Sequence, residues 1–159
     1  MPDTAERDAR LALAIVSEPG DRITGTLLAT VGAEETLRLV TADTALPTSV
    51  DAVEGAVWRG RFTARLNPKE VERVREQGDR HGLRLLIPDT PGWPEGLSDL
   101  GVLAPIALWA KGDLGLLTTS LGSRVTIVGA RAATGYGEHV TGEFASDLAA
   151  LPRVVVSGG

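Results

Sequence analysis

The sequence predicts an α/β protein in which a small helical domain precedes an incomplete parallel sheet with flanking helices. Apolar residues recur at helical spacing through the first third of the chain, and four short apolar runs follow residue 82. An amphipathic segment separates the last two runs, which indicates a strand–helix–strand unit with a right-handed crossover. We expect a helical domain over residues 1–60 and an α/β domain over residues 61–159.

Composition narrows the functional classes. The apolar fraction of 43% and the charged fraction of 23% are typical of a soluble globular protein. No apolar run approaches the roughly 20 residues of a membrane span, and no secretory signal is recognisable, so we expect a cytoplasmic protein. The absence of cysteine excludes disulfides, thiolate nucleophiles and cysteine-based zinc sites. The net charge of −5 means that binding to nucleic acid would need a local basic site.

Short helices are predicted through the N-terminal third. Asp21 suits an N-cap and Gly32 suits the residue that ends a helix. The expected helices span residues 5–16, 21–31, 33–41 and 48–57, and each is too short to be stable by itself.

A fifth helix carries the clearest local signals. Asn67 suits its N-cap, Pro68 its first position and Glu70 the third position of a capping box. Gly78 or Gly82 is expected to end it.

The apolar runs after residue 82 are typical of strands buried on both faces of a parallel sheet. They are Leu83–Ile87, Ile106–Ala110, Val125–Val128 and Val154–Val156, with the amphipathic helix at Tyr136–Leu151. The last run leads into a glycine-rich segment where another helix normally follows. We therefore expect a chain truncated at its C-terminus, with apolar surface left exposed.

Residues 124–140 (RVTIVGARAATGYGEHV) carry the chemistry. Gly129 permits a sharp turn after the strand, and Thr134 can cap the following helix. Gly135 and Gly137 let a ligand approach the amides at the helix start. Those amides, the helix dipole and the guanidinium of Arg131 predict a phosphate or carboxylate site.

Other readings of this loop remain open. Such glycines can serve turn geometry alone, and Arg131 can be an ordinary surface charge. A dinucleotide-binding fingerprint fits poorly, because Arg131 stands where its second glycine belongs, so a nicotinamide-dependent oxidoreductase is disfavoured.

The same segment resembles the DprA/Smf family of DNA-processing proteins. That family carries IVG, a small residue, Arg, two further residues, Ser or Thr, one residue and YG, and then a helix and a strand ending in SG. The matching residues here are Ile127, Val128, Gly129, Arg131, Thr134, Tyr136 and Gly137, followed by Val154–Gly158. WAKGDLGLL at 109–117 is similar to the KGN stretch that precedes this motif in the family.

The resemblance implies a Rossmann-like domain behind a SAM-like helical domain, although SEPGD at 17–21 replaces the usual glycine-rich hairpin. It also implies a function without catalysis. We expect no cofactor, and no metal site, because the chain has two isolated histidines, no cysteine and no carboxylates at a metal-binding spacing. Family members bind single-stranded DNA, protect incoming DNA and load RecA onto it in natural transformation and recombination. The expected partners are therefore single-stranded DNA, RecA and a second copy in a homodimer.

The resemblance places the DNA-phosphate site in two loops. The first contributes Gly129, Arg131, Thr134 and Gly137, and the second contributes Ser157 and Gly158. Gly159 departs from the family's usual Leu, and the family's later basic residues have no counterpart here. The alternative function is a nucleotide-processing enzyme of the lysine-decarboxylase-like phosphoribohydrolase class, which has a similar sheet.

Overall fold

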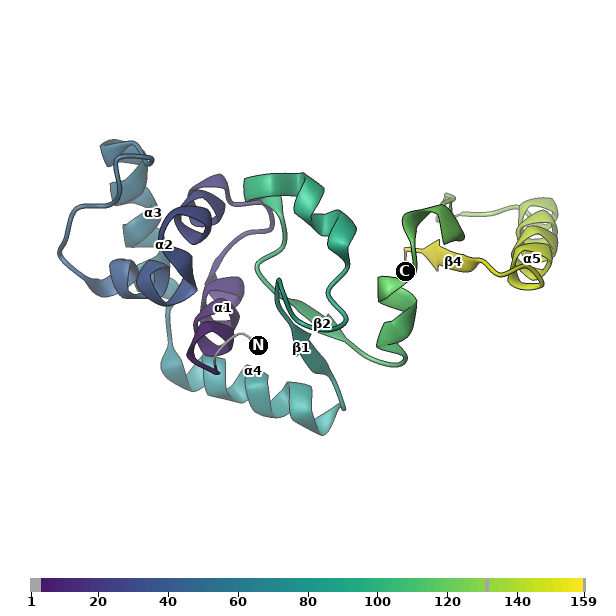
Figure 1. The fold of residues 1–159 in the computed structure, drawn as a ribbon, viewed down its shortest axis with the longest axis horizontal. Coiled ribbons are helices and arrows are strands. Elements are labelled where there is room, and N and C mark those ends of the chain that lie inside the picture. The colour runs from purple at the N-terminus through teal and green to yellow at the C-terminus, as the bar shows by residue number, and fades with distance from the viewer. Residues whose placement is uncertain (1–3, 131, 159) are drawn as a thin grey trace. The chain divides into compact units, whose positions relative to one another are not determined.

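The computed structural model describes residues 4–130 and 132–158 (Figure 1). Its elements are α1 (Thr4–Val16), α2 (Arg22–Thr41), α3 (Ala52–Arg65), α4 (Pro68–Arg80), β1 (Arg84–Leu86), η1 (Glu95–Leu103), β2 (Leu108–Ala110), η2 (Leu114–Thr118), η3 (Leu121–Ser123), β3 (Arg124–Ile127), α5 (Gly135–Ala149) and β4 (Val154–Ser157), where η marks a 3₁₀-helix. The chain forms two compact units, residues 1–114 (unit 1) and residues 115–159 (unit 2). Among the described residues, no helix is both long enough and apolar enough to cross a bilayer.

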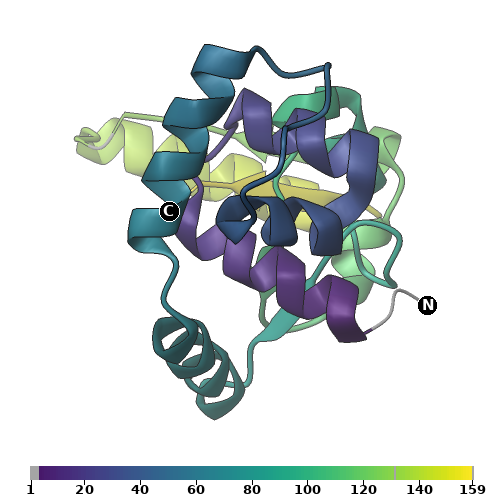
Figure 2. The same ribbon diagram turned by 90° about the vertical axis from the view of Figure 1, so that its left-hand side faces the viewer.

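The core of unit 1 lies among α1, α2 and α3, which pack closely in both views (Figures 1 and 2). Trp58 and Phe62 are its largest side chains, with ring centroids 4.6 Å apart. Leu13, Leu27 and Val40 pack around them and are almost completely buried. The three helices are therefore stabilised together by a shared apolar core.

Asp21 links the start of α2 to this core. Its carboxylate accepts hydrogen bonds from the Thr24 amide at 2.8 Å and the Thr24 hydroxyl at 2.9 Å, which confirms the predicted N-cap. Arg61 Nη2 lies 2.6 Å from the same carboxylate. The buried Trp58 indole donates to Thr24 Oγ1 at 2.9 Å, so the polar atoms at this point of the core are paired.

Gly32 divides α2 into two helical parts, as the sequence predicted. Its φ of 79° and ψ of 174° are not helical and suit a residue without a side chain. The Thr36 hydroxyl donates to the Gly32 carbonyl at 2.6 Å just beyond the break.

The fourth predicted helix is placed too early and is too short. α3 starts at Ala52, after Asp51 accepts hydrogen bonds from the amides of Val53 and Glu54. It continues to Arg65 because Trp58 and Phe62, one turn apart, both enter the core. The residue 60/61 boundary of the predicted domains thus lies inside a helix.

α4 begins as predicted, with the Asn67 side chain accepting from the Lys69 amide at 3.0 Å and Pro68 in the first turn. The return half of the predicted capping box is not formed. Glu70 instead accepts two hydrogen bonds from Arg73, which lower the pKa of the Glu70 carboxyl.

The α/β class is confirmed, but the prediction of one parallel sheet is wrong for the first two strands. β1 and β2 form an antiparallel pair, and β3 and β4 form a separate parallel pair. Short apolar runs indicate burial but do not encode strand direction, which explains the error.

Unit 2 consists of β3, α5 and β4 with the short helices η2 and η3 before them. α5 packs against β4 as the crossover between the parallel strands. Large apolar side chains remain exposed, as expected from the sequence: Leu116, Leu121, Val128, Tyr136, Phe144, Leu151 and Val156.

Two helical glycines provide a matched test of the packing in unit 1. A Cβ at Gly25 would lie 1.8 Å from the carbonyl oxygen of Val102, whereas a Cβ at Gly60 would meet no atom within 4 Å. We expect Gly25→Ala to lower the free energy of unfolding by about 1–3 kcal/mol through overpacking. Gly60→Ala should raise it by about 0.5–1 kcal/mol through helix propensity. Urea unfolding followed by circular dichroism measures both, and equal effects would contradict the α2–η1 contact.

Candidate phosphate site at the β3–β4 edge

The register of β3 and β4 brings the two predicted loops together. Ile127 pairs with Ser157, and both strands run in the same direction. Gly129 follows β3, and Gly158 follows β4, so both loops leave the sheet at its carboxyl edge. Ligands of open α/β sheets bind at this edge.

Thr134 sets the start of α5. Its hydroxyl accepts the amide hydrogen of Gly137 at 3.2 Å, and its carbonyl accepts that of Glu138 at 2.9 Å. The predicted cap is confirmed, but it occupies the Gly137 N–H. The amides of Gly135 and Tyr136 open the helix and have no intrahelical acceptor, so they are the donors that remain for a ligand.

The predicted site residues lie on an open surface. Gly129, Thr134, Ser157 and Gly158 are exposed, and Gly137 is half-buried. Tyr136, which lies among them in the sequence, is 79% exposed. An open edge of this kind suits an extended ligand better than an enclosed small molecule.

Arg131, the predicted side-chain donor, lies outside the described residues. The other two arginines of unit 2 hold backbone groups. Arg124 donates to the carbonyls of Leu117 and Thr119 at 2.6 and 2.5 Å, and Arg153 donates to the carbonyl of Gly122. Their guanidinium groups stabilise the segment before β3.

No cluster of metal-binding side chains occurs in residues 4–130 and 132–158. His139, one turn into α5, lies 3.5 Å from Glu143, and both side chains are exposed. Trp58 and Trp93 are buried, whereas Trp109 is 38% exposed.

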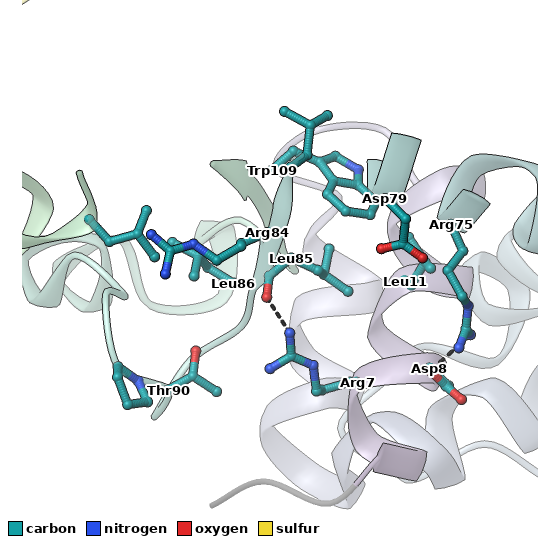
Figure 3. A pocket seen from close by; sticks show the side chains of 13 residues that line it. Arg7, Asp8, Leu11, Arg75, Asp79, Arg84, Leu85, Leu86, Thr90 and Trp109 are labelled. Atoms are coloured by element: carbon teal, nitrogen blue, oxygen red, sulfur yellow. Dashed lines mark hydrogen bonds and ion pairs between the residues drawn. The ribbon is translucent and has the colours of Figure 1, made fainter. Parts of the chain in front are cut away.

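A cavity in unit 1 was not predicted from the sequence. It lies along the edge of β1 and is lined by residues of α1, α4 and β2, including Arg7, Arg75, Asp79 and Trp109 (Figure 3). We call it the β1 cavity. Arg7 and Leu85 are in contact across a separation of 78 residues, so no local sequence signal could reveal it.

Unit 2 is a strand–helix–strand unit whose parallel strands end at one sheet edge, the arrangement of α/β proteins that bind ligands at that edge. Residues 84–159 match the family model of DNA recombination-mediator protein A. The chain is 36% identical over 104 residues to the putative DNA processing protein DprA of two Mycobacterium tuberculosis strains. It is 33% identical over 91 residues to the DNA processing protein DprA of Bacillus subtilis.

Each match covers 57% of this chain but only 26% of the mycobacterial proteins and 28% of the Bacillus protein. No solved structure matches the chain. Residues 84–159 are therefore similar to the family model, and more than half of the chain is similar to these DprA relatives.

Thr134 provides a direct test of the local geometry. Thr134→Ala removes the hydroxyl that accepts the Gly137 amide hydrogen, and losing such a cap costs about 0.5–2 kcal/mol. We expect faster hydrogen exchange of the Gly137 amide and of the first turn of α5, measured by NMR. Thr134→Ser retains a hydroxyl and should preserve the protection. Equal exchange in both variants would contradict the cap.

Proposed function

We propose that this chain binds single-stranded DNA without catalysis and acts in DNA processing during recombination. The β3–β4 register carries the proposal, because it aligns the loop that starts at Gly129 with the Ser157–Gly158 loop. A DNA phosphate would lie at this edge, between the two loops.

The chemistry of the edge supports a phosphate ligand. The amides of Gly135 and Tyr136 and the positive end of the α5 dipole favour an anion. Arg131 adds a donor that can bind two phosphate oxygens at once. Because Arg124 and Arg153 hold backbone carbonyls, Arg131 is the arginine of unit 2 that we assign to DNA.

Single-stranded DNA fits the site better than duplex DNA. The exposed Tyr136 lies two residues after the Thr134 cap, where a base next to the bound phosphate can stack on its ring. Unpaired bases are free to stack in this way, whereas the bases of a duplex are not.

The biological context is proposed from the family. The family model is named for mediation of recombination, and the matching relatives are named as DNA processing proteins. We propose that the protein protects incoming single-stranded DNA and loads RecA onto it in natural transformation. RecA and a second copy in a homodimer are its proposed protein partners.

Arg131→Ala tests the assigned phosphate contact. We expect weaker binding of a fluorescent oligothymidine to the 159-residue chain, measured by anisotropy. The slope of log affinity against log salt should fall by about 0.7, the change expected when a single strand loses one phosphate contact.

Arg80→Ala is the matched control. It removes the same charge from an exposed position on α4, where Arg80 pairs with Glu76 at 2.7 Å. Its binding should equal that of the unmodified chain. An unchanged salt slope in Arg131→Ala would overturn the role given to that side chain.

A further inference from the structure

The β1 cavity is a second candidate site. A cationic side chain that can bind an anion and an aromatic side chain on which a base can stack both line it. Its volume is about 550 Å³, within the range of small-molecule sites, and its lining residues belong to unit 1. We propose that it binds one nucleotide, with the phosphate at Arg7 and the base against Trp109. This proposal is independent of the DNA site in unit 2.

Arg7 supplies the positive charge. Its Nη2 donates to the Leu85 carbonyl at 2.6 Å, which holds the guanidinium against the edge of β1 (Figure 3). That acceptor is uncharged, so this contact positions the guanidinium without neutralising it. The remaining N–H groups of a guanidinium suit two oxygens of a phosphate.

The strand edge adds a backbone donor. Leu85 is the pairing partner of Trp109 in the antiparallel β1–β2 pair. Since the Leu85 carbonyl points toward Arg7 instead of β2, the Leu85 N–H points to the same side. A phosphate beside Arg7 would therefore meet a guanidinium and an amide together.

Trp109 supplies a flat apolar surface. Its six-membered ring lies against Gly78 of α4, where an added Cβ would come within 2.6 Å of two ring carbons. This contact fixes the ring, yet 38% of the residue stays exposed. An ordered, partly exposed indole is the side chain on which a nucleobase stacks.

Asp79 of α4 supplies a carboxylate to the lining of the cavity that also contains Trp109. Arg75 of α4, which lines the cavity too, forms an ion pair with Asp8 at 2.8 Å (Figure 3). A carboxylate accepts hydrogen bonds from an amino group on a base. The cavity should therefore prefer adenine, whose ring carries an amino group, to thymine, whose ring carries none.

Tryptophan fluorescence and calorimetry with deoxyadenosine monophosphate test the proposal. The nucleotide should quench the emission of the chain, and Trp109→Phe should remove the quenching while calorimetry still detects binding. The other two tryptophans are 0% and 7% exposed and should not respond. Absence of binding by calorimetry would overturn the proposal.

Arg7→Ala should weaken the nucleotide by about tenfold or more, because a charge-assisted pair of hydrogen bonds is lost. Deoxyadenosine, which lacks the phosphate, should bind equally weakly to both proteins. Arg80→Ala again serves as the matched control, since Arg80 does not line the cavity. If Arg7→Ala binds the nucleotide as tightly as the unmodified chain, the proposal is wrong.

Asp79→Asn gives a second variant that leaves Arg7 in place. It should reduce the preference for deoxyadenosine monophosphate over thymidine monophosphate. No preference in the unmodified chain would contradict the assigned position of the base, even if Arg7→Ala failed to fold.

Two further comparisons distinguish the β1 cavity from the site in unit 2, and a free nucleotide from the end of a DNA strand. Arg131→Ala should leave the quenching of Trp109 emission by the nucleotide unchanged. Loss of this quenching in Arg131→Ala would place the nucleotide in unit 2 and overturn the proposal. A 5′-phosphorylated oligonucleotide that loses affinity in Arg7→Ala would identify the end of a DNA strand as the ligand. A response confined to the mononucleotide would identify a free nucleotide.

Discussion

The parallel register of β3 and β4 is the constraint on which the proposed DNA site depends. Pairing Ile127 with Ser157 aligns the ends of two strands that are 30 residues apart in the chain. α5 makes this alignment possible, because parallel neighbours need a crossover and a helix supplies it. A register shift of one residue would turn the side chains of β4 to the opposite face and displace the second loop.

The two candidate sites of this acidic chain would attract anions in different ways. At the β3–β4 edge the donors are mainly backbone amides at the start of a helix, with one arginine in the loop. In the β1 cavity the main donor is the Arg7 side chain, held in place by a strand carbonyl. Neither arrangement needs a positive net charge, because the attraction acts over the few ångströms around each donor. Local geometry would thus allow a protein of net charge −5 to bind phosphate at the two proposed sites.

Features encoded within one helical turn were predicted well from the sequence. The caps at Asp21, Asn67 and Thr134 are formed as expected, because a cap joins residues two or three positions apart. The break at Gly32 was found for the same reason. The predicted return bond of Glu70 failed because Arg73, three residues away, competes for the same carboxylate.

Features that depend on distant residues were not predicted. The direction of β1 against β2 follows from tertiary packing, and the apolar pattern of each strand is compatible with either direction. The extension of α3 followed from a core that Trp58 shares with α1 and α2. Of the candidate DNA site, the sequence indicated both loops and the cap, but it did not reveal that the cap occupies the Gly137 amide.

NMR titration of the isotope-labelled chain with a short oligothymidine tests the central claim most directly. The amide signals of Gly135, Tyr136, Ser157 and Gly158 should shift together, with one concentration dependence that weakens as salt is added. This result would place the phosphate between the two loops at the carboxyl edge of the β3–β4 pair. Shifts confined to unit 1, or shifts at the start of α5 without any at Ser157 and Gly158, would contradict it.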